Sequence, residues 1–89
     1  MKFRKKPVEV EAMQFTVESK DQVFNFVCGN KHAEFDANLN PVLVIETKEG
    51  DMKAVLGDWV IKEPFPTRDR NYYPCKPDIF EQTYEQVTP

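Results

Sequence analysis

The chain has 89 residues, of which 40% are hydrophobic, and a formal net charge of −3 at pH 7. This length predicts one domain with a small core and little room for a deep enzyme cleft. Mean hydropathy is −0.59, and no apolar run approaches the roughly 20 residues that a membrane-spanning helix needs. No apolar block follows the basic start as in a signal peptide, so we expect a cytoplasmic protein with no membrane association.

Positive charge is concentrated at the start of the chain. Residues 1–6 hold four basic side chains and no acid, whereas residues 7–89 hold 8 basic and 15 acidic side chains, a net charge of −7. A nucleic-acid-binding domain usually has a basic face and a high pI, but the sequence pI is about 5.1. We therefore predict a single domain over residues 1–89 without a nucleic-acid partner. Residues 1–6 form a flexible basic arm, either simply solvated or in contact with an acidic partner.

The first predicted strand covers residues 8–15. Val8, Val10 and Ala12 alternate with Glu9 and Glu11. This period of two is typical of a strand with one buried and one solvated face.

Residues 19–28 predict a short helix that packs on a sheet. Ser19 and Gln22 have the spacing of a capping box, and Gly29 supplies a stop. The apolar residues at helical spacing are Val23, Phe26 and Val27.

The middle of the chain predicts antiparallel strands. Residues 33–35 indicate a short strand, and residues 42–45 are apolar on both faces, as in a central strand. A turn at Gly50 leads into a return strand at 52–56. A second turn at Gly57 leads into a strand at 59–61, so residues 42–62 predict a three-stranded meander.

The C-terminal part predicts a loop, a short strand and a helix. Residues 63–71 form the loop, and Tyr72 and Tyr73 begin a strand that Pro74 ends. Pro77 then begins a helix, with Asp78 in its first turn. Its expected buried side comprises Ile79, Phe80, Thr83 and Tyr84. The predicted class is α+β, with two short helices and one antiparallel sheet of four to five strands, either open or curled like a barrel.

Candidate catalytic and metal-binding residues are few. Cys28 and His32 are four residues apart, but Gly29 interrupts the helix between them and a zinc site needs four ligands. We therefore expect no metal and no cofactor. Cys75 and the single histidine offer one nucleophile and one base, with no third residue to orient the base. The sequence thus favours a protein without enzymatic activity.

Two further residues have structural interpretations that we favour. Cys75 is expected to pack as a small hydrophobe under the C-terminal helix, although the neighbouring Lys76 could lower its thiol pKa. Asp58, directly after Gly57, is expected to accept hydrogen bonds from backbone N–H groups of the turn.

The strongest candidate binding site is a cluster of aromatic and basic residues. Trp, Tyr and Arg dominate interface energetics and also stack on planar ligands. The cluster, next to Phe65, comprises Trp59, Arg68, Arg70, Tyr72, Tyr73 and Lys76. In the alternative interpretation, Trp59 and one tyrosine lie in the core and both arginines are solvated, because a small domain needs its aromatic side chains inside.

Two segments resemble one family. Residues 4–15 read R-K-K-P-V-E-V-E-A-M-Q-F, and residues 73–85 read Y-P-C-K-P-D-I-F-E-Q-T-Y-E, preceded by G-D-W at 57–59. They resemble small proteins of unassigned chemistry that phages and prophages encode. Leu56 stands where that family often has proline, and residues 64–71 exceed its usual link. The resemblance implies a phage accessory protein in the bacterial cytoplasm and carries over no catalytic residue.

Three hypotheses for the function remain at this point. The first is a non-enzymatic protein that binds a host protein, such as a defence component. The second is a homo-oligomeric sponge that sequesters a small anionic, nucleotide-like ligand with the aromatic and arginine cluster. The third is a virion-associated structural module.

Overall fold

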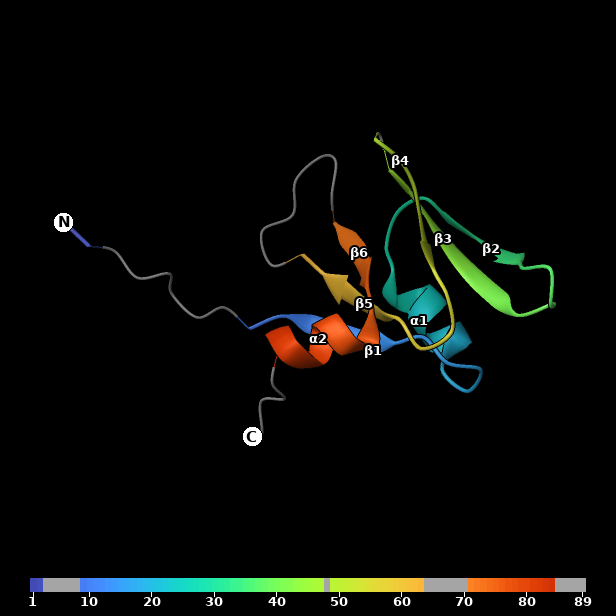
Figure 1. Cartoon of the computed structure of the whole chain (residues 1–89). Coiled ribbons are helices and arrows are strands. Elements are labelled where there is room, and N and C mark those ends of the chain that lie inside the picture. Colours follow the sequence, from blue (N-terminus) through green and yellow to red (C-terminus); the bar gives the residue numbers. More distant parts are fainter. Residues whose placement is uncertain (3–8, 48, 64–70, 85–89) are drawn as a thin grey trace.

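The structure is a computed structural model that describes residues 1–2, 9–47, 49–63 and 71–84. The predicted α+β class with two short helices is confirmed (Figure 1). In chain order the elements are β1 (Glu11–Gln14), α1 (Lys20–Phe26), β2 (Lys31–Phe35), β3 (Pro41–Thr47), β4 (Gly50–Ala54), β5 (Trp59–Lys62), β6 (Tyr72–Cys75) and α2 (Pro77–Thr83).

The strands form two antiparallel sheets of three strands each. Their orders are β1-β5-β6 and β2-β3-β4. The predicted single sheet of four to five strands is therefore corrected to six strands in two sheets over the described residues, and neither of these sheets is closed into a barrel. Within its sheet β3 is central, as the apolar run at 42–45 predicted.

The predicted meander over residues 42–62 is wrong in its third strand. β3 and β4 form the expected hairpin, but β5 pairs with β1 and β6. The cause lies in the turn before β5, where Gly57 has φ +97°. The Phe15 N–H donates to the carbonyl of Asp58 at 2.8 Å, and the Gly57 N–H donates to the carbonyl of Phe15 at 2.7 Å. These bonds hold the turn against the end of β1, so β5 continues along β1.

The main core is shared by α1 and both sheets. Its buried members are Phe15, Val23, Val27, Leu43, Ile45, Ala54, Val60 and Tyr72. The ring of Tyr72 meets Phe26 edge to face, with centroids 5.5 Å apart. The short helix α1 is thus fixed by packing, since seven residues are too few to form a stable helix alone.

A second apolar layer lies between α2 and the other face of the first sheet. Alternation along β5 places Trp59 and Ile61 on the face opposite Val60. Ile61 is fully buried there without belonging to the main core cluster. The ring of Phe80 in α2 stacks on Trp59, with centroids 4.2 Å apart.

The limits of several elements differ from the predictions. β1 begins only at Glu11, and Val8 lies outside the described residues. Ser19 precedes α1, but the capping box is wrong because the Ser19 hydroxyl bonds with Thr16 and with the carbonyl of Gln14. On the C-terminal helix, Ile79 and Thr83 are exposed although a buried position was expected.

β6 continues through Pro74 to Cys75, contrary to the prediction that Pro74 ends it. Pro74 pairs with Val60, and β6 is the outermost strand of its sheet. Proline is tolerated there because its missing N–H falls on the side away from β5.

A candidate binding groove between α1 and the β2–β3 hairpin

The structure describes only part of the aromatic and basic cluster expected from the sequence. Arg68 and Arg70, together with Phe65 and the rest of 64–70, lie outside the described residues. Tyr72 is 6% exposed and belongs to the core, so it is not available to a partner. Trp59 and Tyr73 are half-buried.

Trp59 and Tyr73 contact α2 and its end. Trp59 stacks on Phe80, and Phe80 in turn stacks on Tyr84 with centroids 5.0 Å apart. The hydroxyls of Tyr73 and Tyr84 lie 3.5 Å apart. The indole N–H of Trp59 is buried without a hydrogen-bond partner within the described part of the chain. These rings therefore stabilise the attachment of α2.

Lys76 is exposed but already faces a carboxylate. Its Nζ lies 3.4 Å from both carboxylate oxygens of Asp58, whose side chain is only 4% exposed. Asp58 also accepts a hydrogen bond of 3.0 Å from the N–H of Val55, which confirms its predicted role in the turn. Part of the positive charge of Lys76 thus balances a buried acid.

Cys75 is half-buried and not activated. Burial raises the pKa of its thiol, and the carboxylates of Asp58 and Asp78 add to the effect. The neighbouring Lys76 does not reverse this, and its carbonyl lies 3.6 Å from the sulfur.

His32 lies between two carboxylates on the outer face of the second sheet. Its Nδ1 is 3.2 Å from Glu46 and its Nε2 is 3.1 Å from Glu34. The hydrogen bond to Glu46, followed by that to Glu34, raises the pKa of His32. Lys53 extends the network, 3.4 Å from Glu34. In the described ranges, no group of three or more His, Cys, Asp or Glu side chains could hold a metal ion.

A groove opens on the opposite face of that sheet, beside α1. It has a volume of about 280 Å³. Its apolar lining comes from the segment before α1, from α1, β2 and β3: Phe15, Phe24, Ala33, Phe35, Pro41, Val42 and Leu43. The charged residues that line the groove are Lys20, Asp21 and Glu34, and the carboxylate of Glu34 is turned to His32 on the other face.

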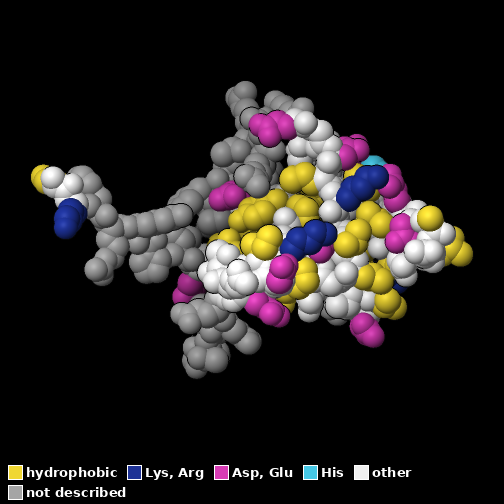
Figure 2. All heavy atoms as spheres, in the orientation of Figure 1, with side chains coloured by type: hydrophobic (Ala, Val, Ile, Leu, Met, Phe, Trp, Pro, Cys, Tyr) yellow, Lys and Arg dark blue, Asp and Glu magenta, His cyan; other side chains and the backbone are white. Residues whose placement is uncertain are grey.

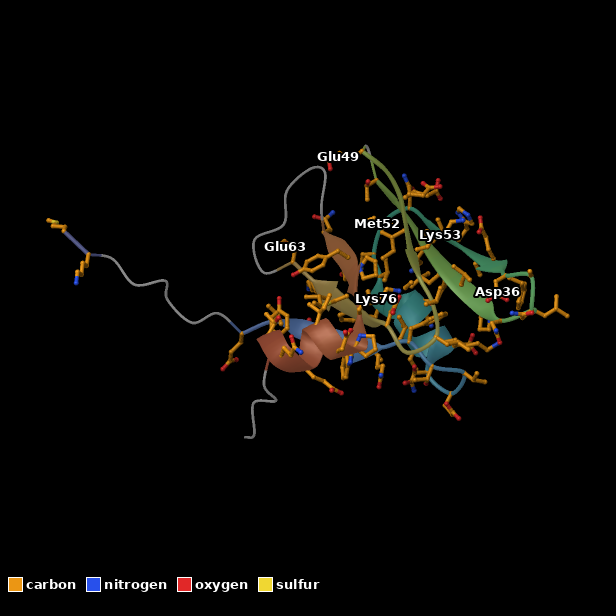
Figure 3. The ribbon with its side chains drawn as sticks, in the orientation of Figure 1. Asp36, Glu49, Met52, Lys53, Glu63 and Lys76 are labelled. Atoms are coloured by element: carbon orange, nitrogen blue, oxygen red, sulfur yellow. The ribbon has the colours of Figure 1, made fainter. Side chains whose placement is uncertain are left out.

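Two large apolar side chains stand exposed at the end of the β2–β3 hairpin that borders this groove. Phe35 at the end of β2 is 67% exposed, and Leu39 in the turn to β3 is 79% exposed. Asp36, labelled at this end of the hairpin in Figure 3, lies between them in the sequence. Figure 2 shows hydrophobic side chains at the same rim of the molecule, next to acidic ones.

The turn that carries Leu39 is held by Asp36. One carboxylate oxygen of Asp36 accepts the N–H groups of Asn38 and Asn40, each at 2.9 Å. Leu39 is thereby kept at φ +63°, in the left-handed region. For a residue with a Cβ this conformation costs roughly 1–2 kcal/mol.

Sequence reasoning missed this groove. Residues 31–41 are mostly polar, and Phe35 and Leu39 stand singly in them. The signal that could have revealed the exposed leucine is the turn itself, since aspartate followed by two asparagines favours a tight turn.

The comparisons with known proteins match nothing: no family model, no curated protein and no solved structure is similar to this chain. Neither described helix is long and apolar enough to cross a membrane. The geometry of the described residues therefore carries the functional argument alone.

Proposed function

We propose that this chain is a non-enzymatic binding protein that contacts a partner protein through the groove beside α1. The contact surface, called the groove surface below, comprises Phe24, Phe35, Leu39 and Pro41. This keeps the first of the three hypotheses, a phage accessory protein acting on a host protein.

The observation that carries this proposal is the state of Leu39. A leucine at positive φ lowers the stability of the fold, and at 79% exposure it recovers little by burial. Glycine or asparagine would fit the same turn at lower cost. A strained and exposed leucine beside an exposed phenylalanine is consistent with a hydrophobic contact to another molecule.

The groove fits side chains better than it fits a nucleotide-sized ligand. This groove of about 280 Å³ has a mostly apolar lining, which suits apolar side chains better than the phosphates of a nucleotide. The sponge hypothesis relied on aromatic rings beside arginines, but Tyr72 is buried and Trp59 stacks on Phe80. These contacts favour a protein partner over a small anionic ligand.

The contacts of the two candidate catalytic residues also favour binding over catalysis. Burial raises the pKa of the Cys75 thiol, so little nucleophilic thiolate is present near neutral pH. Both ring nitrogens of His32 face carboxylates on the outer face of the second sheet.

Site-specific photocrosslinking in bacterial cells tests the proposal. Benzoylphenylalanine replaces Phe35 in one variant and, as a matched control, the exposed Ile79 of α2 in another. We expect a protein adduct from position 35 only. The adduct is identified by mass spectrometry and the complex is rebuilt from purified proteins. The Leu39→Gly variant should then bind at least about tenfold more weakly, the effect of about 1.4 kcal/mol.

Two outcomes would contradict the proposal. One is an equal set of adducts at positions 35 and 79, which would mean that the groove surface has no preference for a partner. The other is native mass spectrometry that shows a retained nucleotide-like ligand in an oligomer with no protein adduct at position 35, which would favour the sponge.

A further inference from the structure

Resting on the proposed function, we infer that the bound part of the partner is an extended, basic peptide segment that adds to the second sheet as a new strand beside β2. Apolar side chains at every second position of that segment enter the groove. This names the mode of binding and the chemistry of the segment.

The hydrogen bonds of the hairpin show which backbone groups of β2 are unused. The Glu46 N–H donates to the carbonyl of Asn30, and the Asp36 N–H donates to the carbonyl of Asn40, both at 3.0 Å. In an antiparallel pair the bonded residues alternate, so His32 and Glu34 also direct their N–H and C=O groups toward β3.

The remaining residues of β2 direct their backbone groups away from β3. These are Lys31, Ala33 and Phe35. β2 is the outermost strand of its sheet, and no described strand pairs with its outer edge. The edge therefore offers N–H and C=O groups at every second residue, which is the pattern that an extended peptide requires.

The same three residues have their side chains on the face toward α1. The ammonium of Lys31 donates to the carbonyls of Phe24 and Val27 at the end of α1. Ala33 and Phe35 line the groove. A strand added beside β2 would place alternate side chains on that same face, beside the small Ala33 and the exposed ring of Phe35.

The other sheet edges are less open to a peptide. β6 carries Pro74, which has no N–H, and it lies beside β4. At the outer edge of β1, the carbonyl of Gln14 already accepts the hydroxyl of Ser19. β2 thus presents an edge of five residues that carries no proline and lies beside no other described strand except β3.

Charge favours a basic segment. Residues 7–89 carry a net charge of −7. Asp21 at the groove and Asp36 in the adjoining turn outnumber Lys20. The ammonium of Lys31 is engaged by carbonyls, and the carboxylate of Glu34 is engaged by His32 and Lys53. Lysine or arginine between or beside the apolar positions of the peptide would therefore be attracted, and an acidic segment would be repelled.

Selection from a random library of peptides of about seven residues, against the whole protein, tests this inference. Selected peptides should alternate apolar residues and carry lysine or arginine. Each backbone amide of the best binder is then N-methylated in turn. We expect weakening of about tenfold at every second position and little change between, because only alternate amides bond to β2.

Amide hydrogen exchange in the protein supplies the second readout. On peptide binding, the N–H groups of Ala33 and Phe35 should become protected. Those of His32 and Glu34, which already bond to β3, should change little and serve as internal controls. Phe35→Ala and Leu39→Gly should each weaken peptide binding about tenfold or more, whereas Ile79→Ala should not.

The outcomes separate this inference from the proposed function. Binding that is lost in Phe35→Ala but shows no alternation in the N-methyl series overturns strand addition and leaves the groove surface in place. Selection of acidic peptides, or of none, overturns the inferred chemistry of the segment. Peptide binding that neither Phe35→Ala nor Leu39→Gly affects, with no adduct at position 35, overturns both.

Discussion

Leu39 combines a strained backbone with an exposed side chain. Its replacement by glycine should therefore raise the stability of the fold while it weakens binding of the partner. Leu39→Gly removes a strain of roughly 1–2 kcal/mol and adds about 0.5–1 kcal/mol of unfolded-state entropy. We expect a net gain of about 0.5–1 kcal/mol, which raises Tm by roughly 2–8 °C in a domain of this size. Thermal unfolding followed by circular dichroism measures it. A lower Tm would mean that Leu39 stabilises the fold by packing.

Asp58 stabilises its turn mainly as a hydrogen-bond acceptor. Asp58→Ala leaves the N–H of Val55 without its partner and should lower the free energy of unfolding by about 1–3 kcal/mol. Asp58→Asn keeps an acceptor and loses only the contact with the exposed Lys76, which is worth less than about 1 kcal/mol. Urea unfolding of both variants and of Lys76→Met measures the difference. Equal losses in the Ala and Asn variants would show instead that the ion pair dominates.

His32 should make stability depend on pH near neutrality. Its hydrogen bonds to Glu46 and Glu34 raise its pKa in the folded state. The folded state therefore binds the proton more tightly than the unfolded state does. The resulting stabilisation is fully present below the ordinary pKa of about 6.5 and is lost as pH rises through the folded-state pKa. Urea unfolding across this range should show the decline, and His32→Gln should remove it. If the free energy of unfolding of His32→Gln falls with pH as steeply as that of the unchanged protein, another group causes the pH dependence.

Individual residues differ in how far their roles could be predicted. Asp58 follows a glycine in a tight turn, and this local pattern was sufficient to predict that its carboxylate accepts a hydrogen bond from a backbone N–H. Ser19 has an equally local pattern, yet its hydroxyl bonds to Thr16 and Gln14, because the chain turns sharply between β1 and α1. The exposure of Phe35 could not be predicted, since it depends on how α1 packs beside the far end of β2.

Among the elements, α2 is the one attached by a single aromatic layer. Trp59→Ala removes the ring that Phe80 stacks on, and we expect a loss of about 2–3 kcal/mol. This is less than the roughly 3–5 kcal/mol of a fully buried ring, since Trp59 is only half-buried. Trp59→Phe should lose less, because it keeps an aromatic ring and removes a buried N–H that has no described partner. Urea unfolding compares the two. If Trp59→Ala leaves the free energy of unfolding unchanged, the Trp59 ring is not needed to hold α2 and is available to contact a partner.

Elements with local signals were predicted well. The β3–β4 hairpin and the start of α2 at Pro77 follow from the apolar run at 42–45, the turn glycine and the position of the proline. The strand at 59–61 was also identified, but its neighbours were not. Its pairing depends on bonds between Phe15 and the turn at Gly57, which are far apart in the sequence.

At the scale of the whole molecule, the division into two sheets decides which surfaces exist. Residues 31–54 build the second sheet alone, so its outer edge comes from one continuous segment, and α1 with the segment before it completes the groove. The first sheet instead joins strands from both halves of the chain. The hydrophobic pattern of a segment indicates a strand but does not indicate which other strands it pairs with. One sheet was therefore expected.

The pairing of β1 with β5 also sets an order of events during synthesis. Glu11 pairs with Lys62, so β1 has no strand partner until β5 has been made. At roughly 5–20 residues per second, the interval between these strands takes about 2–10 s on the ribosome. The β2–β3 and β3–β4 hairpins close far shorter loops, at lower entropic cost. They are complete before β1 can pair, so the second sheet can form before the first, in which β1 waits for β5 and β6 is the last strand to be made.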